Sequence, residues 1–148
     1  MIPIATKKMK NTWSFSIPST RDRIHVALEA TDAWLRKQHF REQDVHDVSL
    51  AVVEAVNNAI IHGNREDPRK KVNLSFSLSP GELVVKVTDQ GKGFNLRAVP
   101  CCFPAHPSLA SHGRGILLMR TLVDEVGFEP LKGGLRVRLV KRRDSKAS

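Results

Sequence analysis

Four stretches of the chain alternate apolar and polar residues, which is the periodicity of a strand with one buried face. They run over residues 13–17, 72–78, 83–87 and 135–139. Pro18 ends the first stretch, and Pro80-Gly81 predicts a turn between the second and the third. The middle pair therefore predicts an antiparallel hairpin. Residues 127–130 are expected to form a short strand or connection before the last stretch.

Three other stretches place apolar residues on one face at helical spacing. They run from residue 19 to about 38, from about 43 to 62, and from 116 to 126. Ser19 is the expected N-cap of the first helix, with Asp22 reaching back in a capping box. Gly63 is the expected C′ residue that ends the second helix.

The order of these elements is strand, two helices, hairpin, loop, helix and hairpin. Because each strand has one apolar face, the helices should cover one side of the sheet. The sequence predicts an α/β two-layer sandwich, with a mixed, mostly antiparallel sheet covered on one face by about three helices. We expect a single domain over residues 1–148, with a core of about 12–141 between a basic N-terminal tail and a polar C-terminal tail.

The composition indicates the cellular compartment in which the protein is expected to reside. No apolar run is long enough to span a bilayer, and the first ten residues lack the apolar centre of a signal peptide. Cys101 and Cys102 are the only cysteines, and adjacent cysteines rarely form a disulfide, which agrees with a reducing compartment. We therefore expect a cytoplasmic protein without membrane attachment.

The formal net charge of +9 leaves the class of partner open. The basic residues are spread along the chain, and no helix-turn-helix, zinc-finger or aromatic RNA-binding motif accompanies them. An acidic protein partner or a nucleotide would suit the charge equally well. We expect no specific nucleic-acid binding.

Three polar residues interrupt the apolar face of the second helix. Glu54, Asn58 and His62 lie four residues apart, so they stack along one stripe. Their neighbours are apolar and belong to the expected core: Val48, Val52, Ala55, Val56, Ala59 and Ile60. A carboxylate and an amide beside a packed face cost free energy unless a partner satisfies them. Either they cap internal groups, or a ligand completes them.

Two glycine motifs follow downstream. Asp89-x-Gly91-x-Gly93 comes directly after a strand, and Gly113-Arg114-Gly115 opens the third helix after a long aperiodic loop. Glycines let backbone N–H groups approach phosphates, and a helix N-terminus attracts negative charge. An aspartate can accept a hydrogen bond from an exocyclic amine, and an Asn oxygen is a suitable ligand for Mg²⁺. Together with the helix stripe, these motifs predict a nucleotide site.

In this order, the stripe and the two glycine motifs resemble the N, G1 and G2 boxes of the GHKL (Bergerat-fold) ATPases. Residues 53–63 are especially similar to the anti-sigma-factor serine protein kinases of the RsbW and SpoIIAB kind. The resemblance covers about residues 13–140. It implies the histidine-kinase-like ATPase fold, with ATP and Mg²⁺ as cofactors.

The resemblance also implies a role for each matching residue. Asn58 would coordinate the Mg²⁺ that bridges the ATP phosphates, and Asp89 would bind the adenine amine. Glu54 would act as general base on the serine hydroxyl of a partner protein. The matching glycines would shape the adenine pocket or hold the phosphates: Gly91, Gly93, Gly113 and Gly115.

The implied partners are a sigma factor and an anti-anti-sigma (STAS) antagonist, with the chain itself as a homodimer. Arg23 loosely matches a partner-contacting arginine of the family, with Arg21 or a plain surface role as alternatives. Lys92 and Arg114 either touch the phosphates or are solvated. His62 is assigned to the last helical turn. The loop before the third helix is rich in Pro, Cys and His, unlike the family, so no contacts are transferred to it.

Other interpretations remain beside this one. Cys101, Cys102, His106 and His112 have the residue types of a zinc site, although their spacing matches no common zinc motif. A stand-alone histidine-kinase-type ATPase domain would share the fold but take its histidine substrate from another protein. A regulatory module could bind ATP and sequester a partner without phosphorylating it, and a basic nucleic-acid binder is a further class.

Overall fold

A computed structural model describes residues 11–91 and 110–143, with side chains omitted over 110–114. The elements in chain order are β1 (Asn11–Pro18), the 3₁₀ turn η1 (Arg21–Arg23), α2 (Ile24–Lys37), α3 (Glu42–Asn58), the π-helical turn η2 (Ala59–Gly63), β2 (Lys71–Ser79), β3 (Glu82–Thr88), α4 (Ala110–Leu122), β4 (Glu125–Leu131) and β5 (Gly134–Arg142). Within these ranges no helix has both the length and the apolarity to cross a membrane.

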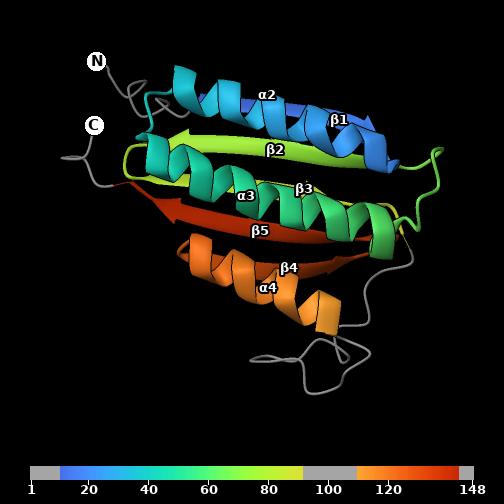
Figure 1. Ribbon diagram of the computed structural model, residues 1–148. Coiled ribbons are helices and arrows are strands. Elements are labelled where there is room, and N and C mark those ends of the chain that lie inside the picture. The colour runs from blue at the N-terminus through green and yellow to red at the C-terminus, as the bar shows by residue number, and fades with distance from the viewer. Residues whose placement is uncertain (1–10, 92–109, 144–148) are drawn as a thin grey trace, which may run out of the picture.

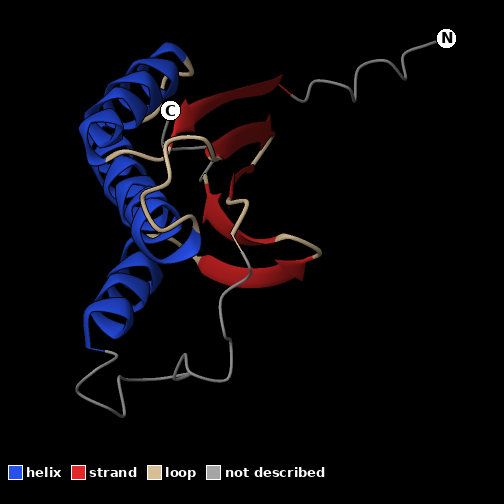
Figure 2. Ribbon diagram, turned by 90° about the vertical axis from the view of Figure 1, so that its right-hand side faces the viewer, coloured by secondary structure: helices blue, strands red, loops and turns tan. Residues whose placement is uncertain are grey.

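The strands form one sheet in the order β1-β2-β3-β5-β4, and every neighbouring pair is antiparallel (Figure 1). The three α-helices lie side by side on one face of this sheet, and within the described ranges the other face carries no helix (Figure 2). The predicted two-layer α/β sandwich is confirmed. The described sheet has no parallel pair: β1 and β2, joined through α2 and α3, run antiparallel, and β4, which follows α4, runs parallel to β3 but is separated from it by β5.

The core lies between the sheet and the helices, and an aromatic cluster closes it at the β1 edge. The ring centroid of Phe76 lies 4.9 Å from that of Trp13 and 5.3 Å from that of Trp34. The rings of Trp13 and Trp34 stack at 5.6 Å. Phe76 is only 1% exposed, so β1, β2 and α2 are held together by its packing.

Three local predictions are wrong. Ser19 caps no helix: its hydroxyl donates to the carbonyl of Lys70, and the first helical turn starts after Thr20. Gly63 is not a C′ residue with positive φ, because it lies inside η2. The third helix ends at Leu122, and Val126 belongs to β4, where it pairs with β5.

The aromatic cluster gives a stability prediction. Phe76→Ala should lower the free energy of unfolding by about 3–5 kcal/mol, because it removes a buried ring and leaves a cavity. The neighbouring Ser77 points to the face without helices, so Ser77→Ala should change stability by less than about 0.5 kcal/mol. Urea denaturation followed by circular dichroism measures both, and a similar effect of the two substitutions would contradict the assigned core.

Candidate functional site

Asp89 is a buried carboxylate at the end of β3. Its side chain is 5% exposed, and Oδ1 accepts hydrogen bonds from the backbone N–H groups of Gly91 at 3.0 Å and Leu135 at 3.1 Å. Burial raises the pKa of Asp89 above its ordinary value, while these two backbone donors and the nearby Lys70 oppose that rise. The carboxyl group is thus fixed in position, but its ionised form is less stable than that of an exposed aspartate.

Glycines make room for this carboxylate. A Cβ on Gly63 would fall 2.2 Å from Oδ2 of Asp89, and a Cβ on Gly91 would fall 1.9 Å from the carbonyl oxygen of Gly63. A Cβ on Gly134 would fall 2.1 Å from the carbonyl oxygen of Asp89. Any larger residue at these places would displace the Asp89 loop, so Gly63 and Gly91 serve close approach between two segments.

The turn that ends the second helix brings Gly63 to Asp89. In η2 the backbone N–H of Asn64 donates to the carbonyl of Ala59 at 2.8 Å, five residues back instead of four. Wide turns of this kind occur within helices chiefly near functional sites. Here the wide turn lies between the last residue of α3, Asn58, and the glycine that contacts Asp89.

Asn64 fixes the loop that follows Asp89. It is 1% exposed, and its Nδ2 donates to the Ser19 hydroxyl at 2.7 Å and to the carbonyl of Lys71 at 3.0 Å. Its Oδ1 accepts the backbone N–H of Gln90 at 2.7 Å. One amide therefore links the end of β1, the start of β2 and the residue after Asp89. The sequence alone does not reveal that Asn64 links these segments, since Asn after Gly is equally typical of a plain turn.

Glu54 and Asn58 meet α4 at Gly115. A Cβ built on Gly115 would lie 3.1 Å from Oε1 of Glu54 and 3.5 Å from Nδ2 of Asn58. Both side chains are half-buried. Among the described residues, neither has a side-chain hydrogen bond that would explain it as an internal cap. The stripe on α3 therefore faces the glycine motif of α4 at close range, where a Cβ would press against the Glu54 carboxylate.

A narrow pocket connects the two groups. It is lined by Asn58 and Asp89 and by apolar side chains from α3, η2 and the strands: Ala59, Val87, Phe128, Leu135 and Val137. Its chemistry is that of apolar walls with one amide and one carboxylate. The pocket measures only about 10 Å³, which is room for about one water molecule, so its walls must part before a flat ring with a hydrogen-bond donor can enter.

The predicted site residues are thus partly brought together. Asp89 and Gly91 form one group, and Glu54, Asn58 and Gly115 form another, with Asn58 and Asp89 lining the same narrow pocket. Gly113 lies in the first turns of α4, which begins at Ala110, so the glycine motif lies inside the helix and not before it. The side chain of Arg114, together with Lys92 and Gly93, lies outside the described residues.

The other candidates have different surroundings. Arg23 is exposed in η1, with its guanidinium 3.8 Å from Asp22. Arg21 forms a two-contact ion pair with Glu66 at 3.0 and 3.1 Å. His62 is half-buried in η2. The cysteines and histidines of the zinc alternative, Cys101, Cys102, His106 and the side chain of His112, lie outside the described residues.

The histidine kinase-like ATPase domain model matches residues 17–141, and the chain belongs to that family. Among its curated relatives is an anti-sigma F factor of Clostridium botulinum, 36% identical over 102 residues, which are 67% of this chain and 71% of that protein. The serine-protein kinase RsbW of Bacillus licheniformis is 31% identical over 111 residues, covering 71% of this chain and 69% of the kinase. The resemblance drawn from the sequence motifs is confirmed.

Solved structures support the fold. The RsbU and RsbW domains of Rv1364c from Mycobacterium tuberculosis align with a TM-score of 0.67 at 19% identity, over 89% of this chain and 32% of that one. The SiaB–SiaC complex from Pseudomonas aeruginosa aligns with a TM-score of 0.64 at 14% identity, over 92% of both chains. This chain spans about a third of the mycobacterial protein, so the likeness concerns the ATPase-type domain alone.

The close packing around Asp89 gives a prediction with a matched control. Gly91→Ala should lower the free energy of unfolding by about 1–3 kcal/mol, because its Cβ would collide with backbone. A Cβ on Gly127 in β4 meets nothing within 4 Å, so Gly127→Ala should leave stability unchanged or raise it by up to about 1 kcal/mol. Urea denaturation of both variants measures the difference, and equal stabilities would refute the steric role of Gly91.

Proposed function

We propose that this chain is an ATP-dependent serine protein kinase and anti-sigma factor. It binds a sigma factor and phosphorylates a serine on an anti-anti-sigma (STAS) antagonist in the cytoplasm. The observation that carries the proposal is the pairing of Glu54 and Asn58 against Gly115, with Asn58 also lining a pocket that it shares with Asp89. The family membership and the names of the relatives, anti-sigma F factor and serine-protein kinase RsbW, support it.

The residues present fit adenine and a nearby metal ion. Asp89 offers a fixed, buried acceptor to the exocyclic amine, and apolar side chains line the narrow pocket that must open to admit the ring. The side-chain oxygen of Asn58 is a hard ligand of the type that Mg²⁺ takes when it keeps most of its waters. Gly115 leaves the space beside Asn58 that a side chain would fill. Bound ATP supplies the phosphoryl group for transfer.

Glu54 is proposed as the general base. Its carboxylate lies one helical turn before Asn58, so a serine hydroxyl held near the metal site could donate a hydrogen bond to it. Glu54 would orient that hydroxyl and accept its proton, which is the part of phosphoryl transfer that a side chain performs beyond charge stabilisation. Gly113 and Arg114, with Gly93, are proposed to complete the phosphate side, and Arg23 to contact a partner. A homodimer is the proposed assembly.

The base assignment is tested by Glu54→Gln. This substitution keeps the size and removes the proton acceptor, so transfer to a serine partner should fall by about 10²–10⁴-fold while ATP binding is retained. Transfer is measured with radiolabelled ATP and a candidate antagonist, and binding by calorimetry. A Glu54→Gln protein that still phosphorylates its partner at the wild-type rate would remove the role of Glu54.

The same assay separates the alternatives. Acid-stable phosphoserine on the antagonist supports a serine kinase, whereas acid-labile phosphohistidine would indicate a stand-alone histidine-kinase-type domain. ATP binding together with sequestration of a sigma factor, but with no transfer to any antagonist, would indicate a non-catalytic module.

The raised pKa of Asp89 gives a pH prediction. The adenine amine donates to the ionised carboxylate, so nucleotide binding favours the form that burial disfavours. Affinity for ATP should therefore rise as the pH increases through the raised pKa of the free protein and fall below it, where a proton must first be lost. Asp89→Asn should bind ATP more weakly and lose this dependence, since Asn does not titrate.

Calorimetric titrations of both proteins from mildly acidic to neutral pH measure the effect, and the protonation of ATP itself cancels in the comparison. Identical pH profiles for the wild type and Asp89→Asn would contradict the assignment of Asp89 to the nucleotide.

A further inference from the structure

The face of the sheet opposite the helices (Figure 2) carries mostly polar side chains in two neighbouring rows. The alternation that buries one side of each strand presents small hydroxyl and amide side chains on the other, in register across the strands. One row pairs Ser16 with Asn73, Asn73 with Thr88, and Thr88 with Arg136. The next row pairs Ser14 with Ser75, Ser75 with Lys86, and Lys86 with Arg138.

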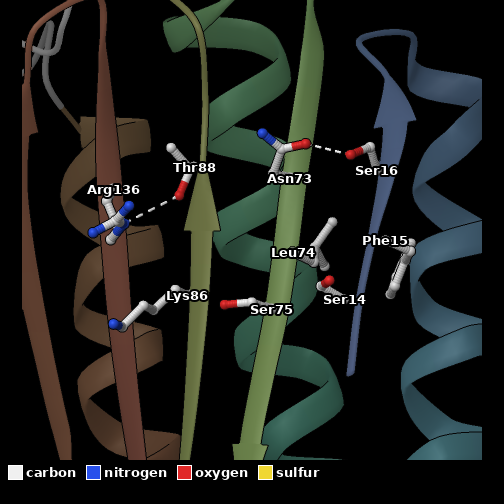
Figure 3. Close-up of a pocket in the computed structure, with 9 residues that line it drawn as sticks. All are labelled: Ser14, Phe15, Ser16, Asn73, Leu74, Ser75, Lys86, Thr88 and Arg136. Carbon is white, nitrogen blue, oxygen red and sulfur yellow. Dashed lines mark hydrogen bonds between the residues drawn. The ribbon is translucent and has the colours of Figure 1, made fainter. Parts of the chain in front are cut away.

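These two rows line a hollow of about 380 Å³ that crosses β1, β2, β3 and β5 (Figure 3). Two side-chain hydrogen bonds join neighbouring strands here: the hydroxyl of Ser16 donates to Oδ1 of Asn73, and the guanidinium of Arg136 donates to the hydroxyl of Thr88 at 3.4 Å. These bonds link β1 to β2 and β3 to β5, so part of the lining is held in place. Its residues are Ser14, Phe15, Ser16, Asn73, Leu74, Ser75, Lys86, Thr88 and Arg136.

The charges in this hollow have one sign. Lys86 and Arg136 are its two ionised lining residues, and the lining includes no carboxylate. The nearest acidic groups lie outward on β4: Glu129 is 3.4 Å from Arg136, and Glu125 is 4.0 Å from Arg138. Lys86 has neutral Ser75 on one side and Arg138 on the other. A cation flanked by another cation favours an anion above it.

The uncharged residues that line the hollow indicate which kind of anion would bind there. Single-stranded nucleic acid needs exposed rings for base stacking, but the only ring here, Phe15, packs in the aromatic cluster 4.7 Å from Trp13. A second copy of the chain placed face to face would oppose Lys86 and Arg136 to cations of the same kind. Small hydroxyl groups around two cations instead suit carboxylates on an extended peptide, which accept hydrogen bonds as well as charge.

We propose that this hollow is a docking site for an acidic segment of a protein partner, with carboxylates on Lys86 and Arg136. Four strands span about 14 Å at the usual strand spacing, enough for about four residues of extended chain. The helices that carry the nucleotide site cover the opposite face, so the two sites can be occupied together (Figure 2). The proposal does not depend on ATP or on phosphorylation. In this proposal Lys86 and Arg136, which contribute to the net charge of +9, bind the partner's carboxylates.

The test compares two charge reversals of equal size. Lys86→Glu places a carboxylate opposite Arg138, a favourable cross-strand pair, so the sheet should keep its stability. Lys37→Glu makes the same change in net charge at the exposed end of α2, on the helical side. The probe is a fluorescein-labelled decaglutamate peptide, whose binding to each full-length protein is followed by fluorescence anisotropy at low and physiological salt.

We expect Lys86→Glu to weaken peptide binding about five- to tenfold and Lys37→Glu to leave it unchanged, since only a local contact separates the two. Arg136→Gln should weaken binding as well. Amide chemical-shift changes on adding the peptide should fall on β1, β2, β3 and β5, at Ser75 and Thr88 among others.

Three results would overturn the proposal. Equal weakening by Lys86→Glu and Lys37→Glu would mean that net charge alone attracts the peptide. Tighter binding of a single-stranded oligothymidylate, lost in Lys86→Glu, would assign the face to nucleic acid. A dimer seen by sedimentation that Lys86→Glu dissociates would assign it to a second copy of the chain.

Discussion

The burial of the Asp89 carboxylate is the constraint on which the site depends. A carboxylate that is 5% exposed is costly unless fixed donors face it, and here both donors are backbone N–H groups, from Gly91 and Leu135. The surrounding segments pack closely enough to require glycine at three places. Gly63 and Gly134 leave room for Asp89 itself, and Gly91 leaves room for the carbonyl of Gly63.

The same burial couples stability to ligand binding. Because the pKa of Asp89 is raised, the folded protein holds this proton more firmly than the unfolded chain does. Its contribution to stability is therefore present below the ordinary pKa and is lost as the pH rises through the raised value. A donor at the carboxylate would recover that loss at neutral pH. Because the ionised Asp89 is poorly stabilised in the free protein, a nucleotide that donated a hydrogen bond to it would stabilise the folded state.

The sequence predicted most of the fold because its strands alternate cleanly and its helices have one apolar face. The stripe of Glu54 and Asn58 and the Asp89 motif were also selected as candidate site residues in advance, because polar residues on an apolar face are costly without a partner, and their roles remain predictions. The predictions that were wrong or missing concern local structure. Ser19 has the chemistry of an N-cap, but it bonds to Lys70, a residue far along the chain. Asn64 could not be distinguished from a turn residue, because its partners come from three segments that meet only in the fold. The π-helical turn has no sequence signal of its own.

The sheet divides the chemistry between two faces. Alternation forces every residue of β3 to serve one side or the other: Val85, Val87 and Asp89 point toward the helices, and Lys86 and Thr88 point away. A strand that leads into the proposed nucleotide-site aspartate on one side therefore presents a cation, Lys86, on the other side three residues earlier. Because β3 is the central strand, paired with both β2 and β5, its position is well fixed. A ligand that shifted β3 from the open face would also move Asp89, because Asp89 directly follows this strand. Displacement of β3 would therefore couple binding at the two faces.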